Sequence, residues 1–122
     1  MYRIKKRLEI AGAHQLTLPY ESKCEVLHGH NWVITVEVEA EELDANGMVC
    51  DFGEIKGEVM RLDHAKLNTV IPQPTAEHIA FWIFERVTYA LSISLHSKKD
   101  ALPRVVKVTV QESEGNEACY IP

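Results

Sequence analysis

The sequence has few cysteines and no long apolar segment. Three of its 122 residues are cysteine, and they are scattered without a Cys-x-x-Cys pair. This usage argues against a disulfide framework and favours reduced thiols, as in a cytoplasmic protein. No apolar run approaches the roughly 20 residues that a membrane-spanning helix needs, so we expect no membrane partner. The basic N-terminal segment lacks the apolar core of a signal peptide, which also favours the cytoplasm.

The sequence also lacks an excess of positive charge. The formal net charge is −5, and acidic and basic residues are interleaved. Phosphate backbones are bound by concentrated basic surfaces, so nucleic acid is not an expected partner. In contrast, 46% hydrophobic and 25% charged residues are ordinary values for a globular domain. The length suits one compact core, and we predict a single domain over residues 1–122.

Alternation of apolar and polar residues predicts four strands. The first two cover residues 2–14 and 28–40, the third covers residues 104–113, and a short last strand covers residues 118–122. In the long strands most even-numbered residues are apolar and most odd-numbered residues are polar. In the third strand this parity assigns three valines to the buried face: Val106, Val108 and Val110.

Two helices are predicted between the second and third strands. Asp51, in an Asp-x-x-Glu start, caps a helix that runs to about Leu62. Thr75 caps a second helix, whose apolar residues follow helical spacing to Leu91. Residues 94–103 predict a solvated loop. This order of strands and helices indicates a two-layer α+β domain, with both helices on the even-numbered face of an antiparallel sheet.

Three histidines are predicted to meet at one end of the sheet. His28 and His30 are two positions apart on a strand, so their side chains project from the same face. His14 shares the parity of the apolar residues and ends the first strand, which makes it a neighbour if the two strands form a hairpin. Three imidazoles with an open fourth position are the ligand set of catalytic zinc. Zinc is favoured over copper or iron because no carboxylate triad or methionine ligand is suggested nearby, and Gly29 would permit close backbone approach or an unusual dihedral.

Cys24 allows two interpretations. It could be a fourth ligand, which would make a closed structural site. Alternatively it is a free thiol near the metal, whose positive charge would favour a thiolate that acts as base or nucleophile. The other two cysteines, Cys50 in a predicted short strand and Cys119 in the last strand, are interpreted as packing residues.

Two further carboxylate-bearing sites are candidates. Asp63 beside His64 can form an acid–base pair. The residues alone favour a simpler interpretation, in which His64 lies at the end of a helix and Asp63 is solvated. Glu112 has the parity of an apolar strand face. A carboxylate there either holds a polar ligand, such as the paired N–H donors of a heterocycle, or simply reaches water at the strand end.

Together these residues resemble the 6-pyruvoyl-tetrahydropterin synthase family, most closely its bacterial branch of 6-carboxytetrahydropterin synthases in queuosine biosynthesis. Three residues separate the cysteine from the His-Gly-His motif, as in that branch, whereas the animal pyruvoyl enzymes carry a longer gap. The matching motifs occur in family order over nearly the whole chain: AGAHQL, KCEVLHGHNW, GMVCDF, RLDHAKLN, PTAEH and VQES.

The resemblance implies roles for the candidate residues. The three histidines would bind zinc, and Cys24 would be a catalytic base and not a ligand. Asp63 and His64 would belong to the same acid–base machinery. Glu112 would anchor the pterin ring, with Thr75 near that pocket.

The resemblance also implies a fold and a reaction. The fold would be the tunnelling fold, in which subunits join their sheets into a barrel, commonly as a homo-hexamer of two trimers with active sites at subunit interfaces. The polar sheet face would then line the tunnel. The substrate would be 7,8-dihydroneopterin triphosphate, and the products 6-carboxytetrahydropterin, acetaldehyde and triphosphate.

Other functions stay open at this point. They are pyruvoyl-type synthesis, side-chain cleavage of a pterin such as sepiapterin, and a zinc-stabilised module without chemistry. Three positions depart from the family pattern, because Gln15, His78 and Ser113 stand where arginine, asparagine and threonine are frequent.

Overall fold

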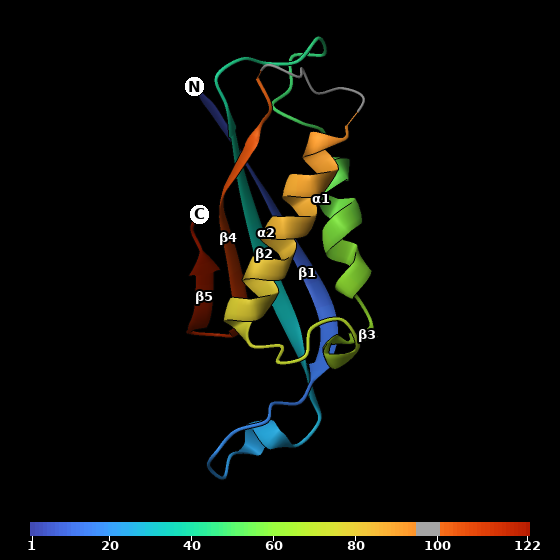
Figure 1. Cartoon of the computed structure of the whole chain (residues 1–122), viewed down its shortest axis with the longest axis vertical. Coiled ribbons are helices and arrows are strands. Elements are labelled where there is room, and N and C mark those ends of the chain that lie inside the picture. Colours follow the sequence, from blue (N-terminus) through green and yellow to red (C-terminus); the bar gives the residue numbers. More distant parts are fainter. Residues whose placement is uncertain (95–100) are drawn as a thin grey trace.

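The computed structural model describes residues 1–94 and 101–122. Within these ranges the chain forms one five-stranded sheet in the order β3-β1-β2-β4-β5, with two helices on one of its faces (Figure 1). The predicted α+β class with two helices on one face is confirmed. The elements are β1 (Tyr2–His14), β2 (His28–Ala40), α1 (Phe52–Val59), β3 (Ala65–Lys66), α2 (Ala76–Ser92), β4 (Arg104–Ser113) and β5 (Asn116–Tyr120).

The sheet is antiparallel except at its β3 edge. The β1–β2 register runs unbroken from Tyr2 opposite Ala40 to His14 opposite His28. β3 pairs in parallel with the end of β1 and was not predicted. A strand of two residues is too short to carry an alternating pattern, so only its position beside β1 identifies it.

The core lies between the even-numbered face of the sheet and the two helices, as predicted. Along β2, four consecutive even-numbered residues are 0% exposed: Trp32, Ile34, Val36 and Val38. The helix α2 buries a helically spaced stripe against them: Ile79, Ile83, Val87 and Leu91. The period-2 and period-3.6 patterns therefore meet in one layer of apolar side chains.

The prediction that Val106 of β4 lies in the core is wrong. The register with β2 shifts between Glu37 and Val38, where β4 contains an extra residue. As a result Val105 pairs with Val38 and is 4% exposed, while Val106 is the extra residue between the two pairs and is only half-buried. A β-bulge reverses the parity of the residues beyond it, which alternation alone does not reveal.

The predicted helix starts are confirmed. The Asp51 carboxylate accepts a hydrogen bond from the Gly53 N–H (2.7 Å), and the Thr75 hydroxyl accepts one from the His78 N–H (3.1 Å). The helix α1 ends at Val59, and a 3-10 turn continues to the predicted end.

The predicted solvated loop over residues 94–103 falls largely outside the described residues, because residues 95–100 are not described. In the remainder of the chain, no helix has the length and apolar character needed to cross a membrane.

Trp32 connects the core to the end of β1, and its replacement should destabilise the fold. Its indole N–H donates to the Gly12 carbonyl (3.0 Å), and the side chain is fully buried. Trp32→Phe leaves that carbonyl without its partner, so we expect the free energy of unfolding to fall by about 1–3 kcal/mol. Urea denaturation followed by circular dichroism measures this loss. Trp82→Phe, on the half-buried part of α2, is the matched control, and equal losses in the two variants would contradict the interpretation.

Candidate metal centre and active site

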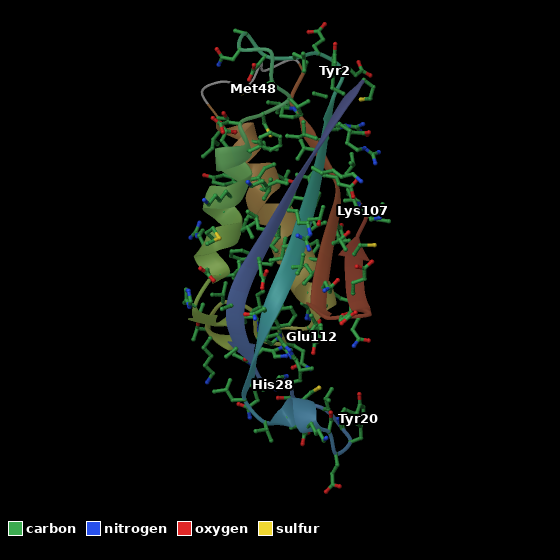
Figure 2. All side chains as sticks on the ribbon, turned by 180° about the vertical axis from the view of Figure 1, so that it is seen from behind. Tyr2, Tyr20, His28, Met48, Lys107 and Glu112 are labelled. Atoms are coloured by element: carbon green, nitrogen blue, oxygen red, sulfur yellow. The ribbon has the colours of Figure 1, made fainter. Side chains whose placement is uncertain are left out.

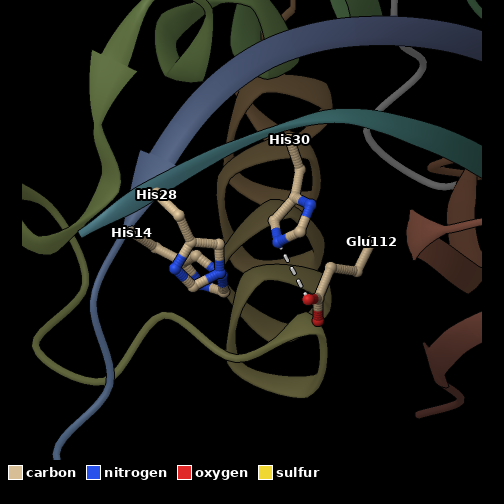
Figure 3. Close-up of side chains that lie close together, drawn as sticks. All are labelled: His14, His28, His30 and Glu112. Atoms are coloured by element: carbon tan, nitrogen blue, oxygen red, sulfur yellow. Dashed lines mark hydrogen bonds and ion pairs between the residues drawn. The ribbon is translucent and has the colours of Figure 1, made fainter. Parts of the chain in front are cut away.

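The three predicted histidines meet at one end of the sheet. His14 ends β1 directly opposite His28, which begins β2, and their Nε2 atoms are 3.0 Å apart. The ring of His30 lies with its centroid 5.3 Å from that of His14 and 4.7 Å from that of His28 (Figure 3). The structure therefore brings together the three side chains that strand parity selected. Their role as metal ligands stays a prediction.

Backbone carbonyls orient two of these rings. His14 Nδ1 lies 2.7 Å from the Pro74 carbonyl, and His28 Nδ1 lies 2.6 Å from the Val26 carbonyl. A carbonyl only accepts, so each Nδ1 must donate, and in the neutral rings both Nε2 atoms present lone pairs. Two lone pairs 3.0 Å apart repel each other unless a proton or a cation lies between them. Sequence reasoning missed both carbonyls, because a backbone acceptor has no residue-type signal.

The environment of His14 favours its neutral form. Burial lowers the pKa of His14, and the neighbouring His28 and His30 lower it further, while the Pro74 carbonyl and the Glu112 carboxylate oppose the shift. A neutral imidazole is the form that binds a metal.

Glu112 is the fourth member of the group. Its Oε1 lies 3.0 Å from His30 Nε2, a buried atom that makes no hydrogen bond within the described part of the chain. The distance thus permits an ion pair, whereas the angles do not suit a hydrogen bond. The β4–β5 register shifts between Gln111 and Ser113, and such irregularities often redirect a side chain. Parity placed Glu112 on this face, but its contact with the histidines was not predicted.

The four side chains suit a divalent metal. The ligand atoms of His14, His28, His30 and Glu112 all lie within 4.8 Å of one another. Three imidazole nitrogens and a carboxylate oxygen form a typical zinc ligand set, and the unbonded Nε2 of His30 supplies a buried atom that needs a partner. The donor set therefore fits the zinc that the sequence predicted.

Cys24 does not belong to this group. It lies in a short 3-10 turn, Lys23–Glu25, within the connection between β1 and β2, and is half-buried. The closed site of three histidines and one cysteine is therefore not formed in this structure.

The other thiols are placed differently. Cys50 is buried, as expected of a packing residue, whereas Cys119 is exposed on β5, so its predicted packing role is wrong. Cys50 lies in a bend and not in the predicted strand. Its burial, reinforced by nearby carboxylates, raises its pKa to about 12, so this thiol is inert at neutral pH.

Asp63 and His64 are held against the edge of β1. Asp63 Oδ1 accepts from the Ala11 N–H (2.9 Å), and the His64 N–H donates to the Ala11 carbonyl (2.6 Å). The aspartate is therefore engaged and not simply solvated. His64 has a φ of 55°, which is uncommon for a residue other than glycine. Its ring is 82% exposed and lies 3.5 Å from Asp63 Oδ2, at a distance that suits an ion pair when the ring is protonated.

An open depression of about 490 Å³ lies beside His64. Small residues of β1 and β2 line it, together with His30, His64 and Lys66. Gly29 is among these residues, and a Cβ there would find its nearest neighbour at 3.9 Å. The expected close backbone approach at Gly29 is therefore wrong, and its φ is not in the left-handed region.

Thr75 uses its hydroxyl to cap α2, immediately after the carbonyl of Pro74 that orients His14. It is thus close in the chain to the metal centre.

Comparisons with known proteins find pterin enzymes that are similar to this chain in sequence and in fold. The family profile described as 6-pyruvoyl tetrahydropterin synthase matches residues 3–122. A 6-carboxy-5,6,7,8-tetrahydropterin synthase of Synechocystis is 37% identical over 108 residues, covering 80% of this chain and 83% of the relative. A dihydroneopterin monophosphate aldolase of Pyrococcus furiosus is 39% identical over 89 residues, covering 70% and 74%. The 6-pyruvoyl tetrahydropterin synthase of Caenorhabditis elegans superimposes with a TM-score of 0.73 at 25% identity, covering 99% of this chain and 95% of the other.

Zinc affinity should depend on the histidines more than on Glu112. Loss of a partner that only orients a ligand costs about 10–100-fold in affinity, so loss of a ligand in His14→Ala or His28→Ala should cost at least about 100-fold. If Glu112 serves mainly as a pterin anchor, Glu112→Gln should keep the affinity within about tenfold. Competition with a chromophoric chelator measures these affinities.

His64→Ala, which removes a histidine that is 82% exposed and lies outside the group, is the control for zinc affinity. An affinity in His14→Ala equal to that of His64→Ala would contradict the metal site. A loss in Glu112→Gln as large as that in His14→Ala would instead make the carboxylate a ligand.

Proposed function

Because the chain belongs to the 6-pyruvoyl tetrahydropterin synthase family, we propose that it is a zinc-dependent 6-carboxy-5,6,7,8-tetrahydropterin synthase. Its fold is the tunnelling fold of that family. The substrates are 7,8-dihydroneopterin triphosphate and one molecule of water, and the products are 6-carboxytetrahydropterin, acetaldehyde and triphosphate, in queuosine biosynthesis. The observation that carries this proposal is the short distance of 3.0 Å between His14 Nε2 and His28 Nε2, whose lone pairs face each other. His30 and Glu112 lie beside these two atoms.

The histidines would hold zinc, which when bound supplies Lewis acidity to the side-chain oxygens of the substrate. Cys24, as a thiolate, takes the proton from the adjacent carbon. His64, oriented by Asp63 at 3.5 Å, moves a proton elsewhere on the side chain. Glu112 accepts paired N–H donors of the pterin ring, with Thr75 beside that pocket.

Both outer edges of the sheet support assembly with further copies. β3 covers β1 only at Gly12 and Ala13, and within the described residues no strand pairs with the outer edge of β5. Exposed edges of this kind are ready to pair with another chain. We propose a homo-hexamer of two trimers, in which neighbouring sheets join into a barrel. A neighbour would then complete the site around the exposed His64 ring and supply basic groups for the triphosphate.

The polar face of the sheet suits the lining of a tunnel. Its central Glu37 is only 5% exposed, yet it forms ion pairs with Arg3 (3.2 Å) and Lys5 (3.6 Å). Charges paired in this way can face an enclosed, water-filled space without a large desolvation cost. The scattered free cysteines favour a cytoplasmic location.

A second candidate function is the aldolase reaction. The Pyrococcus furiosus relative bears the name dihydroneopterin monophosphate aldolase and is 39% identical over 89 residues. The three residues between Cys24 and His28 favour the carboxy branch over pyruvoyl synthesis, but this spacing does not bear on sepiapterin cleavage or on the aldolase.

Product identification decides between these reactions. We expect the zinc-loaded protein to convert 7,8-dihydroneopterin triphosphate into equal amounts of acetaldehyde and 6-carboxytetrahydropterin, measured by mass spectrometry. A pyruvoyl product without acetaldehyde would reject the proposal, and preferential turnover of the monophosphate would favour the aldolase. Loss of folding on zinc removal, in a chain that turns over no pterin, would indicate a zinc-stabilised module.

Cys24→Ala should abolish most of the turnover without loss of zinc. General base catalysis contributes about 10²–10⁴-fold, so we expect kcat to fall by at least about 100-fold. Cys119→Ser, which removes the exposed thiol of β5, should keep the activity of the parent. Full activity of Cys24→Ala with zinc bound would contradict the role of this cysteine as base.

A further inference from the structure

The connection between β1 and β2 carries Cys24, yet it lies outside the sheet. Residues 15–27 leave the sheet at His14, return to it at His28 and project beyond its end, where Tyr20 lies (Figure 2). A long connection has many conformations unless other parts of the chain hold it. The place of Cys24 relative to the histidines therefore depends on the contacts of this segment.

Two side-chain amides hold the start of the segment. Asn68 Oδ1 accepts from the Gln15 N–H (2.9 Å), and its Nδ2 donates to the Gln15 carbonyl (2.7 Å). Gln73 repeats the pattern at Thr17, where Oε1 accepts from the N–H (3.0 Å) and Nε2 donates to the carbonyl (2.9 Å). Each amide thus takes the place that the backbone of a neighbouring strand would occupy.

The opposite side of the same segment holds the Cys24 turn. In an extended chain, backbone groups of successive residues point to opposite sides, so Leu16 faces away from the two amides. The Leu16 N–H donates to the Cys24 carbonyl (2.8 Å), and the Leu18 N–H donates to the Glu25 carboxylate (3.4 Å). The turn is therefore attached to a strand-like segment whose other side is fixed by Asn68 and Gln73.

The residues around Gln73 also orient a predicted metal ligand. The next residue, Pro74, provides the carbonyl that accepts from His14 Nδ1 (2.7 Å). Gln73 is itself fixed, because its carbonyl accepts from the Thr75 N–H (2.9 Å) and from His78 Nδ1 (2.7 Å). One short stretch thus sets both the ring of His14 and the start of the projecting segment.

We propose that Asn68 and Gln73 are positioning residues, whose amides hold the 15–17 backbone so that Cys24 keeps one place relative to His14. This inference rests on the proposed function, in which Cys24 takes a proton from the substrate. The two amides act through the backbone that they hold. A displacement of about 1 Å in a reacting group can cost on the order of 10²-fold in rate, so weak bonds can have a large kinetic effect.

The reactivity of Cys24 tests the placement of the segment without any turnover. In a Cys119→Ser background, iodoacetamide reports on Cys24, because Cys50 is buried with its pKa raised to about 12. In Asn68→Ala and Gln73→Ala we expect the half-buried Cys24 to be alkylated at least about threefold faster, since local opening exposes it more often.

Steady-state kinetics test the consequence for the reaction. We expect both alanine variants to lower kcat by about 10–100-fold with KM within about threefold and zinc content unchanged. Asn68→Asp and Gln73→Glu keep the accepting oxygen but lose the N–H donor, so their kcat should lie between parent and alanine variants. Asn46→Ala removes an exposed amide from the turn that follows β2, at the opposite end of the sheet from His28, and should match the parent.

The outcomes separate this proposal from the proposed function. Unchanged alkylation and unchanged kcat in both alanine variants would overturn the positioning role. If kcat falls together with the zinc content, and added zinc restores kcat, the positioning role is overturned, and the two amides instead support the metal site. Faster alkylation in a protein whose parent turns over no pterin would keep the structural role and reject the proposed function. If an alanine variant does not fold, the carboxylate variants provide the same comparison.

Discussion

The unbroken antiparallel register between β1 and β2 is the constraint on which the site depends. It places His14 opposite His28 and Gly12 opposite His30, so all three imidazoles share one face at one end of the sheet. If the pairing of one strand slipped by one residue, its histidine and its core residues would all turn to the other face of the sheet. The same register that buries the apolar residues of β2 therefore also brings the candidate ligands together. One pattern of strand pairing determines both the core and the site.

The candidate metal centre is supported by the segment that leads to α2. Carbonyls orient His14 and His28, and amides from Asn68 and Gln73 hold the chain beyond β1. The Pro74 carbonyl and both amides come from parts of the sequence far from the histidines, whereas the carbonyl that orients His28 belongs to Val26, two residues before it. The segment from Asn68 to Pro74 consequently links the orientation of His14 to the position of the Cys24 turn. The buried Leu67 precedes this segment, and Thr75, which caps α2, follows it.

Much of the fold and part of the site could be predicted because strand and helix periods are local properties. Alternation identified both long strands of the hairpin, and it placed His14, His28, His30 and Glu112 on the covered face. The capping residues Asp51 and Thr75 were visible because a side-chain oxygen two or three positions before an N–H is a short-range feature. The resemblance to a family with ordered motifs added the tunnelling fold, which periodicity could not supply.

The sequence by itself determined the α+β class, the covered sheet face and the grouping of the three histidines, since each follows from residue spacing along one or two strands. Only the tertiary structure decided what depends on contacts between distant segments. It moved Val105 into the core in place of Val106 through a bulge, added β3, and brought Glu112 within 3.0 Å of His30. It also separated Cys24 from the histidines, because amides and carbonyls with no sequence signature direct the path of residues 15–27.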